Sequence, residues 1–260
     1  MNKTLETILG RKSVRSYLDQ PVTSEVREQV LNAAMRSPTA GNLMLYSIIQ
    51  VTDQKIKNTL AKTCDNQPFI ARAPWVLLFL ADYQRWWDYF EVCRVEDFAK
   101  KAGLQWRKPS EGDLMLGCCD ALIAAQTAVI AAESLGLGSC YIGDIMENYE
   151  AHVSLFSLPP YTFPVALLCL GYPSEAEKNR KPSSRFAAGH IVFENRYRRL
   201  GKDEFICMFQ SENDRIFSQQ QEISGAANIG QLTYLRKAGA DFALELNRSV
   251  RAILKNWTGD

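Results

Sequence analysis

The chain has 260 residues, of which 47% are apolar and 23% charged, and its formal net charge is +1. These proportions are those of a folded globular protein, and they exclude collagen-like, low-complexity and disordered chains. The near balance of 30 basic and 29 acidic side chains also argues against a protein whose main partner is nucleic acid or an anionic membrane.

The first part of the chain predicts alternating helices and strands. We expect a short helix over 3–9 and a second helix that begins at Thr23 or Ser24 and stops before Pro38. A strand is expected over 46–52, a short helix over 54–62 and a buried strand over 74–81. The aromatic and charged stretch 83–106 predicts one or two surface or interface helices.

The apolar segment 114–137 is about as long as a membrane span. Asp120, Gln126 and Glu133 interrupt it, and no basic flanks anchor it, so we interpret it as a central core helix or a subunit-interface helix.

The rest of the chain predicts a short strand over 139–142, a buried strand over 164–171 and a polar loop over 173–189. Beyond residue 203 the pattern is helical. The apolar face of a C-terminal helix is expected to consist of Leu246, Val250, Ile253, Leu254 and Trp257. Strands alternating with helices indicate an α/β or α+β domain.

The seven cysteines and two histidines predict no metal site and no disulfide framework. The number of cysteines is odd, and no pair has Cys-x-x-Cys spacing. Residues 1–10 contain no apolar run long enough for a signal peptide. We therefore expect a reduced, cytoplasmic protein.

The usual catalytic motifs are also missing. His152 and His190 are interpreted as structural or surface histidines, and neither a nucleophile elbow nor a phosphate-binding Gly-x4-Gly-Lys loop occurs. Gly136, Gly138 and Gly143 do not have the spacing or context of a dinucleotide fingerprint.

Two short cationic groups stand out instead. Arg11, Ser13 and Arg15 alternate beside Lys12, so in an extended stretch they share one face and could converge on a phosphate. The second group lies far along the chain, at Lys178, Arg180, Lys181 and Arg185. Either group alone is better interpreted as solvated surface charge, but two further segments, 37–42 and 140–144, change that balance.

These segments belong to a colinear series that resembles the nitroreductase family of FMN-dependent oxidoreductases. The series covers roughly residues 5–200 and consists of RKSVRSY, SPTAGN, DNQPFIARAP, AAQTAVIAAESLGLGSCYIGD, LCLGYPSE and the loop with Lys181 and Arg185. Any one motif is weak evidence, whereas six in order are strong.

The resemblance implies an α+β, three-layer fold with a central, mostly antiparallel sheet flanked by helices, and two chains interlocked in a homodimer with FMN at the interface. Residues 1–200 would form the FMN-binding domain and 201–260 a helical C-terminal extension of it. FMN would take hydride from NADH or NADPH at its N5 and reduce a small nitroaromatic, quinone or flavin acceptor in a ping-pong cycle, with no catalytic side chain of the protein's own. No metal, nucleic acid or membrane is expected.

The resemblance also assigns cofactor-binding residues. The phosphate and flavin edge would be held by Arg11, Lys12, Ser13, Arg15, Lys181 and Arg185. Pro38, Thr39, Ala40 and Asn42 would reach the flavin from the partner subunit. Gln67 would lie near the pyrimidine edge, and the turn Tyr141, Ile142 and Gly143 beneath the ring. Asp144 stands where many relatives have glycine, and its charge could alter the flavin potential or the choice between NADH and NADPH.

Two alternatives remain open. Within the family, a flavin reductase, a ring desaturase or a reductive dehalogenase would use the same cofactor contacts. In a different class, the chain would be a non-enzymatic flavin-binding regulator, with the helices of 83–106 as a partner-binding surface.

Overall fold

The computed structural model describes residues 2–259, which divide into two compact units. The first unit comprises residues 2–182 together with 245–259, and the second comprises residues 183–244. Each unit is described by itself below.

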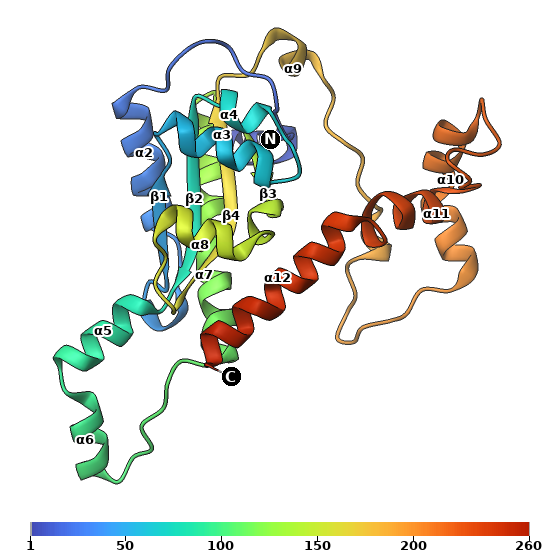
Figure 1. Ribbon diagram of the computed structural model, residues 1–260. Coiled ribbons are helices and arrows are strands. Elements are labelled where there is room, and N and C mark those ends of the chain that lie inside the picture. The colour runs from blue at the N-terminus through green and yellow to red at the C-terminus, as the bar shows by residue number, and fades with distance from the viewer. Residues whose placement is uncertain (1, 260) are drawn as a thin grey trace. The chain divides into compact units, whose positions relative to one another are not determined.

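A four-stranded sheet is the centre of the first unit (Figure 1). Its order is β1 (Tyr46–Gln50), β2 (Trp75–Asp82), β4 (Thr162–Gly171) and β3 (Gly138–Ile142), and all neighbouring strands are antiparallel. Every residue of β2 and β4 is buried, which explains their continuous apolar runs. The expected α+β fold with an antiparallel sheet between helices is confirmed, while the homodimer stays a prediction.

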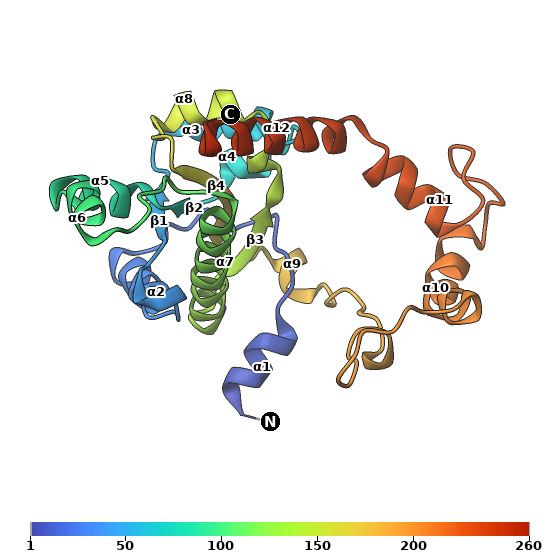
Figure 2. The same ribbon diagram turned by 90° about the horizontal axis from the view of Figure 1, so that it is seen from below.

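Helices cover both faces of this sheet (Figure 2). On one face lies α7 (Glu111–Ser134), with α2 (Ser24–Met35) beside it, and on the other lie α3 (Gln54–Thr63) and α4 (Phe69–Arg72). By length and composition α7 could cross a membrane. Its alanines 121, 124, 125, 128 and 132 are nevertheless fully buried in the core next to the sheet, which agrees with the expected core helix.

The helix ends follow their capping residues. The Thr23 hydroxyl accepts the N–H of Val26 and begins α2, as predicted. The Asp113 carboxylate accepts the N–H of Ser110 at 2.9 Å, so α7 begins three residues before the predicted start at Leu114. The stretch 83–106 forms α5 (Gln84–Val92) and α6 (Val95–Ala102), and the N-terminal helix α1 spans Lys3–Gly10.

The prediction of a loop over 173–189 was wrong in two places. A short helix, α9 (Glu175–Asn179), begins where the Ser174 hydroxyl accepts the N–H of Glu177, and a 3₁₀ turn, η3, spans Ala188–His190. Ser174, followed by Glu175 and Glu177, is an N-terminal helix signal that the polar composition of the loop obscured.

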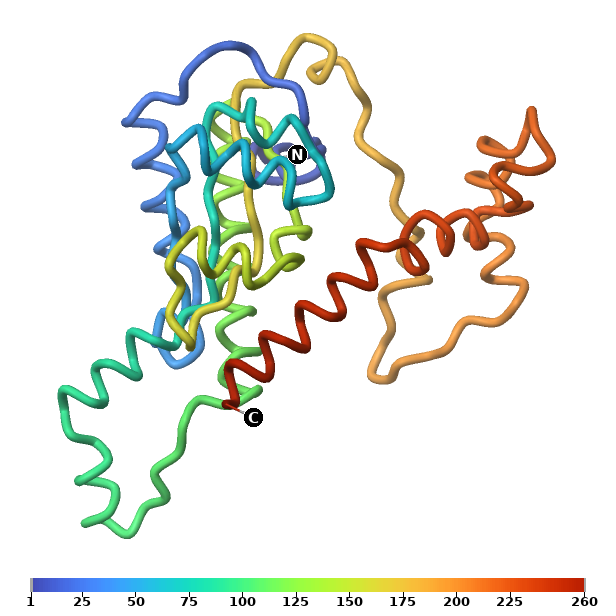
Figure 3. Tube along the Cα trace, in the orientation of Figure 1, coloured from blue at the N-terminus to red at the C-terminus, as the bar shows by residue number. Residues whose placement is uncertain are grey.

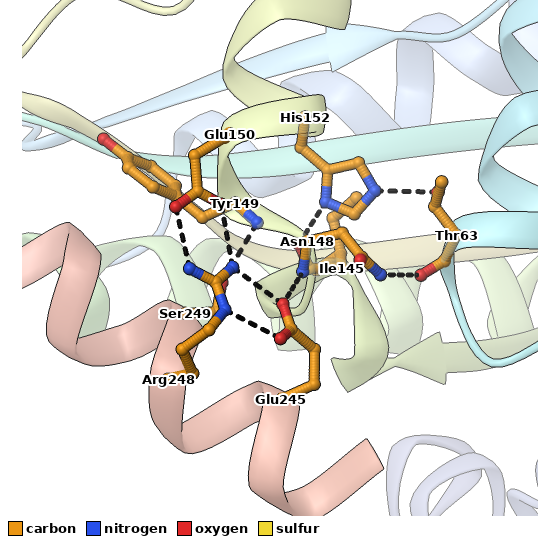
Figure 4. A network of polar contacts seen from close by, with 9 residues as sticks. All are labelled: Thr63, Ile145, Asn148, Tyr149, Glu150, His152, Glu245, Arg248 and Ser249. Atoms are coloured by element: carbon orange, nitrogen blue, oxygen red, sulfur yellow. Dashed lines mark hydrogen bonds and ion pairs between the residues drawn. The ribbon is translucent and has the colours of Figure 1, made fainter. Parts of the chain in front are cut away.

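The C-terminal helix α12 (Asp241–Thr258) is fastened to α8 (Tyr149–Phe156) of the first unit (Figure 4). Glu245 accepts the N–H of Asn148 at 3.0 Å, and the Ser249 hydroxyl accepts the N–H of Tyr149 at 3.0 Å. Side chains of α12 therefore satisfy backbone donors at the start of α8. Ile253 and Trp257 are buried, in agreement with the predicted apolar face.

The second unit is mostly helical. It contains η3, α10 (Lys202–Phe217), α11 (Ile229–Thr233), the π-helical turn η4 (Tyr234–Ala238) and the first residues of α12. Phe186 packs edge-to-face on Phe209, with ring centroids 5.2 Å apart. Residues 201–259 thus contain mainly helices, as expected for the C-terminal extension. The predicted domain boundary at residue 200 stays a prediction.

Candidate functional site

The first cationic segment is extended and lies along the edge strand β3. The N–H of Val14 donates to the carbonyl of Ser139 at 2.8 Å, and Ser13 pairs with Ser139 in a parallel bridge. Val14 is buried, so its neighbours Ser13 and Arg15 point to the opposite side of the extended chain. Gly138 permits this close approach, because a Cβ there would lie 2.6 Å from Cγ2 of Val14.

The second cationic segment is bonded directly to the first. Residues 11–18 run beside residues 172–180 (Figure 3). Glu177 of α9 accepts the N–H of Arg15 at 3.1 Å and Nε of Arg180 at 2.8 Å, while the Arg180 guanidinium also donates to the carbonyl of Ser13. The Lys12 ammonium donates to the carbonyls of Lys178, at 2.9 Å, and Arg180. Lys12 and Arg180 therefore fasten the two segments to each other.

The remaining two predicted cations differ in their placement. Lys181 is exposed and follows Arg180 in the first unit. Arg185 belongs to the second unit, where its guanidinium donates to the carbonyls of Ser183 and Ser184 at 3.1 and 3.0 Å. The expected contacts of both with a phosphate stay predictions.

Within residues 2–259, Arg11 and Arg15 form no ion pair, since neither guanidinium has a carboxylate oxygen within 4.0 Å. The Arg15 guanidinium lies 5.9 Å from the ring centroid of Phe69. Burial raises the pKa of Glu133, whereas the hydrogen bond from Ser139 and the nearby Arg11 charge act to lower it. The guanidinium groups of Arg11 and Arg15 and the hydroxyl of Ser13 form a donor set that fits a phosphate.

The predicted turn follows β3, the strand to which Ser13 and Val14 are bonded. Tyr141 is half-buried, and its hydroxyl lies 3.4 Å from Oε1 of Gln126 on α7, while Ile142 is buried and Gly143 exposed. Gly143 begins the 3₁₀ turn η2 (Gly143–Met146), in which Asp144 follows it. The Asp144 carboxylate accepts Nε2 of Gln67 at 2.8 Å, so two residues predicted to lie at the flavin are in direct contact.

The segment 38–42 is held by one buried carboxylate of α7. Asp120 accepts the N–H of Ala40 at 2.9 Å, the N–H of Leu45 at 3.1 Å and the hydroxyl of Thr39. It stabilises an unusual backbone, since Gly41 and Asn42 both have a positive φ, of 55° and 57°. Asp120 is 2% exposed. In the sequence, Asp120 was noted only because it interrupts the apolar segment 114–137. An acidic residue in a helix that is expected to be buried needs hydrogen-bond donors, and this was the signal that Asp120 positions another segment.

The two segments that carry predicted site residues contact different faces of α7. Thr39 and Ser37 bond to Asp120 and Thr127, whereas Ser139 and Tyr141 bond to Glu133 and Gln126. At 3.6 residues per turn, these faces are separated by about a third of a turn. Within one chain, the structure thus joins 11–15, 139–144, Gln67 and 177–181, and it keeps Pro38, Thr39, Ala40 and Asn42 apart from them.

Glu147 is a further residue that sequence patterns did not single out. It is 4% exposed, and burial together with the nearby Asp144 carboxylate raises its pKa to about 7. Among residues 2–259 no group of three or more His, Cys, Asp or Glu side chains has an arrangement that could hold a metal ion.

Comparisons with known proteins agree on one family. Residues 8–172 match the model described as the nitroreductase family. The chain is 34% identical over 200 residues to the oxygen-insensitive NADPH nitroreductase of Salmonella typhimurium. The aligned residues make up 77% of each chain. It is also 34% identical over 186 residues to an FMN reductase [NAD(P)H] of Bacillus subtilis, which covers 70% of this chain and 71% of that one.

The fold has matching solved structures. Nitroreductase A from Vibrio parahaemolyticus superposes with a TM-score of 0.78 at 29% sequence identity, over 95% of this chain and 96% of that chain. The similarity therefore extends along nearly the whole of both chains.

Proposed function

The chain belongs to the nitroreductase family, and we propose that it is an FMN-dependent NAD(P)H oxidoreductase that reduces small nitroaromatic, quinone or flavin acceptors. Bound FMN would supply the chemistry, accepting hydride from NADH or NADPH and passing two electrons on to the acceptor. The family and the names of the relatives support the reaction class. At these identities the acceptor is our proposal.

The observation that carries this proposal is a cationic segment, beside an exposed backbone turn, in which two arginines form no ion pair within residues 2–259. Arg11 and Arg15 lack ion pairs within residues 2–259, and the segment is bonded to β3, which ends in the exposed Gly143. Such a site favours a ligand that has an anionic group for the two arginines and a flat ring system that can lie against the exposed turn. A phosphate-bearing flavin has both features, so the residues present fit FMN.

Each group of residues would have a distinct task. Arg11, Ser13 and Arg15 would bind the phosphate, together with Lys181. Lys12 and Arg180 would keep the two cationic segments together. Gln67 and the Tyr141–Gly143 turn would orient the ring, which is the main catalytic act when reacting atoms must meet at about 3–3.5 Å.

A homodimer would complete the site. The side of α7 that faces away from its own sheet carries exposed Met115, Leu116, Leu122 and Ile123, and α1 adds exposed Leu5, Ile8 and Leu9. Exposed apolar side chains on two helices of a folded chain favour a protein partner. A second copy is the occupant we propose, because it would bring its own segment 38–42 to the residues 11–15 and 141–144 of the first chain.

We further propose that the enzyme works in the cytoplasm and acts on small molecules. All seven cysteines are free, which suits a reducing compartment. The near-zero net charge gives no support for nucleic acid or a membrane as partner.

The visible absorption spectrum of the purified protein tests the proposal. A flavin spectrum that bleaches on anaerobic addition of NADPH or NADH is expected, followed by recovery with menadione or nitrofurazone. Arg15→Ala should weaken FMN binding about 10- to 100-fold, since a hydrogen bond to a charged group is worth about 1.5–3 kcal/mol. Arg251→Ala, an exposed arginine of α12, is the matched control. A protein that never binds flavin would refute the proposal.

A further inference from the structure

Two carboxyl groups meet directly behind the turn that ends β3. Asp144 and Glu147 both belong to the η2 region, and the N–H of Glu147 donates to the carbonyl of Asp144 at 3.1 Å. Besides burial, the charge of Asp144 and a hydrogen bond between the two carboxyl groups raise the pKa of Glu147, and such a bond requires a proton on one of them. Gln67 holds the outer end of this pair, because its Nε2 donates to Oδ2 of Asp144 at 2.8 Å and to the carbonyl of Cys64 at 3.1 Å.

The Glu147 carboxyl of this pair is buried and forms no ion pair within the described residues. Glu147 is 4% exposed, and its Oε1 has no hydrogen-bond partner within the described residues. An ionised carboxylate in this position would lack both water and a compensating donor, which is costly.

The charged groups around Glu147 are also acidic. Asp144 faces it from η2, Asp65 from the turn after α3, and Glu245 from α12. On α12, the Arg248 guanidinium is bonded to Glu245 and Glu150. On α8, burial lowers the pKa of His152, whose ring bonds to the carbonyl of Ile145 and to the hydroxyl of Thr63, as Figure 4 shows. Burial and the three acidic neighbours thus favour the protonated form of Glu147.

We propose that Asp144 and Glu147 form a carboxyl pair that binds one shared proton near neutral pH, and that Glu147 is a positioning residue that takes up this proton when the adjacent flavin is reduced and releases it when the flavin is reoxidised. The second part rests on the proposed function, while the shared proton is a property of the chain alone.

The electrons and the proton balance as follows. NAD(P)H supplies two electrons to the site, and the proton that offsets the added negative charge passes from solvent to the Glu147 carboxylate. When the acceptor removes the electrons, the proton leaves Glu147 for the reduced acceptor or for solvent. A pKa of about 7 suits this exchange, because both protonation states are then accessible near neutral pH.

The first test uses the protein without flavin. Burial raises the folded pKa of Glu147 from 4.5 to about 7, so its protonated form stabilises the fold fully below about pH 4.5, and this stabilisation is lost as the pH rises through 7. The Tm of wild type should fall between pH 5 and 8, and that of Glu147→Gln should fall less. An infrared band of a protonated carboxyl should also vanish over this range and be absent from Glu147→Gln.

Two variants sharpen this test. Glu150→Gln is the matched control, because hydrogen bonds from Arg248 lower the pKa of Glu150 to about 2, below the range examined. It should keep the wild-type pH dependence between pH 5 and 8. Asp144→Asn removes the acidic neighbour and should move the titration to lower pH. A Glu147→Gln protein with the same band and the same pH dependence as wild type would overturn the shared proton.

The second test uses the flavin-loaded protein. The midpoint potential of the bound flavin should fall more steeply with pH between 6 and 8 in wild type than in Glu147→Gln, by an amount that corresponds to up to one proton per two electrons. Equal slopes, with the infrared band still assigned to Glu147, would overturn the coupling and leave the flavin function standing. Absence of flavin binding would instead refute the proposed function, and the first test would still decide the pair.

Discussion

The Arg248 guanidinium of α12 binds the Glu150 carboxylate of α8 through two hydrogen bonds of 2.8 Å each, across 98 positions of sequence. Arg248 also bonds to Glu245, which accepts the N–H of Asn148 at the start of α8. One guanidinium thus links the C-terminal helix to the helix that follows the predicted flavin turn.

Because of this ion pair, the folding stability should decrease when Glu150 is protonated at low pH. Hydrogen bonding to Arg248 lowers the pKa of Glu150 from 4.5 to about 2, so the stabilisation is present above about pH 4.5 and is lost as the pH falls through 2. Wild type should have a slightly higher Tm than Glu150→Gln at pH 6, and the two should converge near pH 2. The effect is small and weakens with salt because both side chains are exposed. A difference that stays constant from pH 6 to pH 2 would contradict this account.

Removal of Trp257 should strongly destabilise the first unit. Its indole is 1% exposed, donates Nε1 to the carbonyl of Ser110 at 3.0 Å and packs on Tyr161 with ring centroids 5.8 Å apart. Trp257→Ala should lower the free energy of unfolding by about 3–5 kcal/mol, as measured by urea denaturation. Lys255→Ala, at an exposed position of the same helix, is the control and should change it little. Similar losses for both variants would argue against a packed role for the indole.

Asp120→Ala should release the segment 39–45. The substitution leaves the N–H groups of Ala40 and Leu45 without their acceptor, at a cost of about 1–3 kcal/mol. Hydrogen exchange should accelerate at these two amides and remain unchanged in β4. If the proposed dimeric site is correct, FMN affinity should fall as well. Unchanged exchange at Ala40 and Leu45 would show that Asp120 does not hold this segment.

Gly138→Ala should displace the first cationic segment. The added Cβ would lie 2.6 Å from Cγ2 of Val14 and 3.0 Å from Cγ of Pro173, so the segment 11–15 must move away from β3. FMN affinity, measured by quenching of flavin fluorescence, should drop at least several-fold. Gly112→Ala is the control, because a Cβ there meets nothing within 4 Å and alanine favours the helix. Equal affinities in the two variants would contradict the assigned role of 11–15.

The sheet and most helices could be predicted because their determinants are local. The unbroken apolar run 74–81 predicts the buried strand β2, and Thr23 predicts the start of α2. In both cases the residues that determine the element are adjacent in sequence. Glu147 could not be found in this way. Its pKa is raised mainly by burial, then by Asp144 and, to a smaller extent, by Asp65 and Glu245, and both burial and the two distant acids arise only in the folded chain. The roles of Lys12 and Arg180 were hidden for the same reason, because their acceptors are backbone carbonyls that carry no sequence signal.

The division of the chain has a consequence for its covalent integrity. The first unit ends at residue 182 and resumes at 245, so its C-terminal helix is joined to the rest of the unit only through residues 183–244. A single proteolytic cut between residues 183 and 240 would place α12 on a separate fragment that is no longer covalently joined to residues 2–182. The first unit would then be a noncovalent complex of two fragments, and its persistence on dilution would depend on the affinity of α12 rather than on an effective concentration set by the connecting chain.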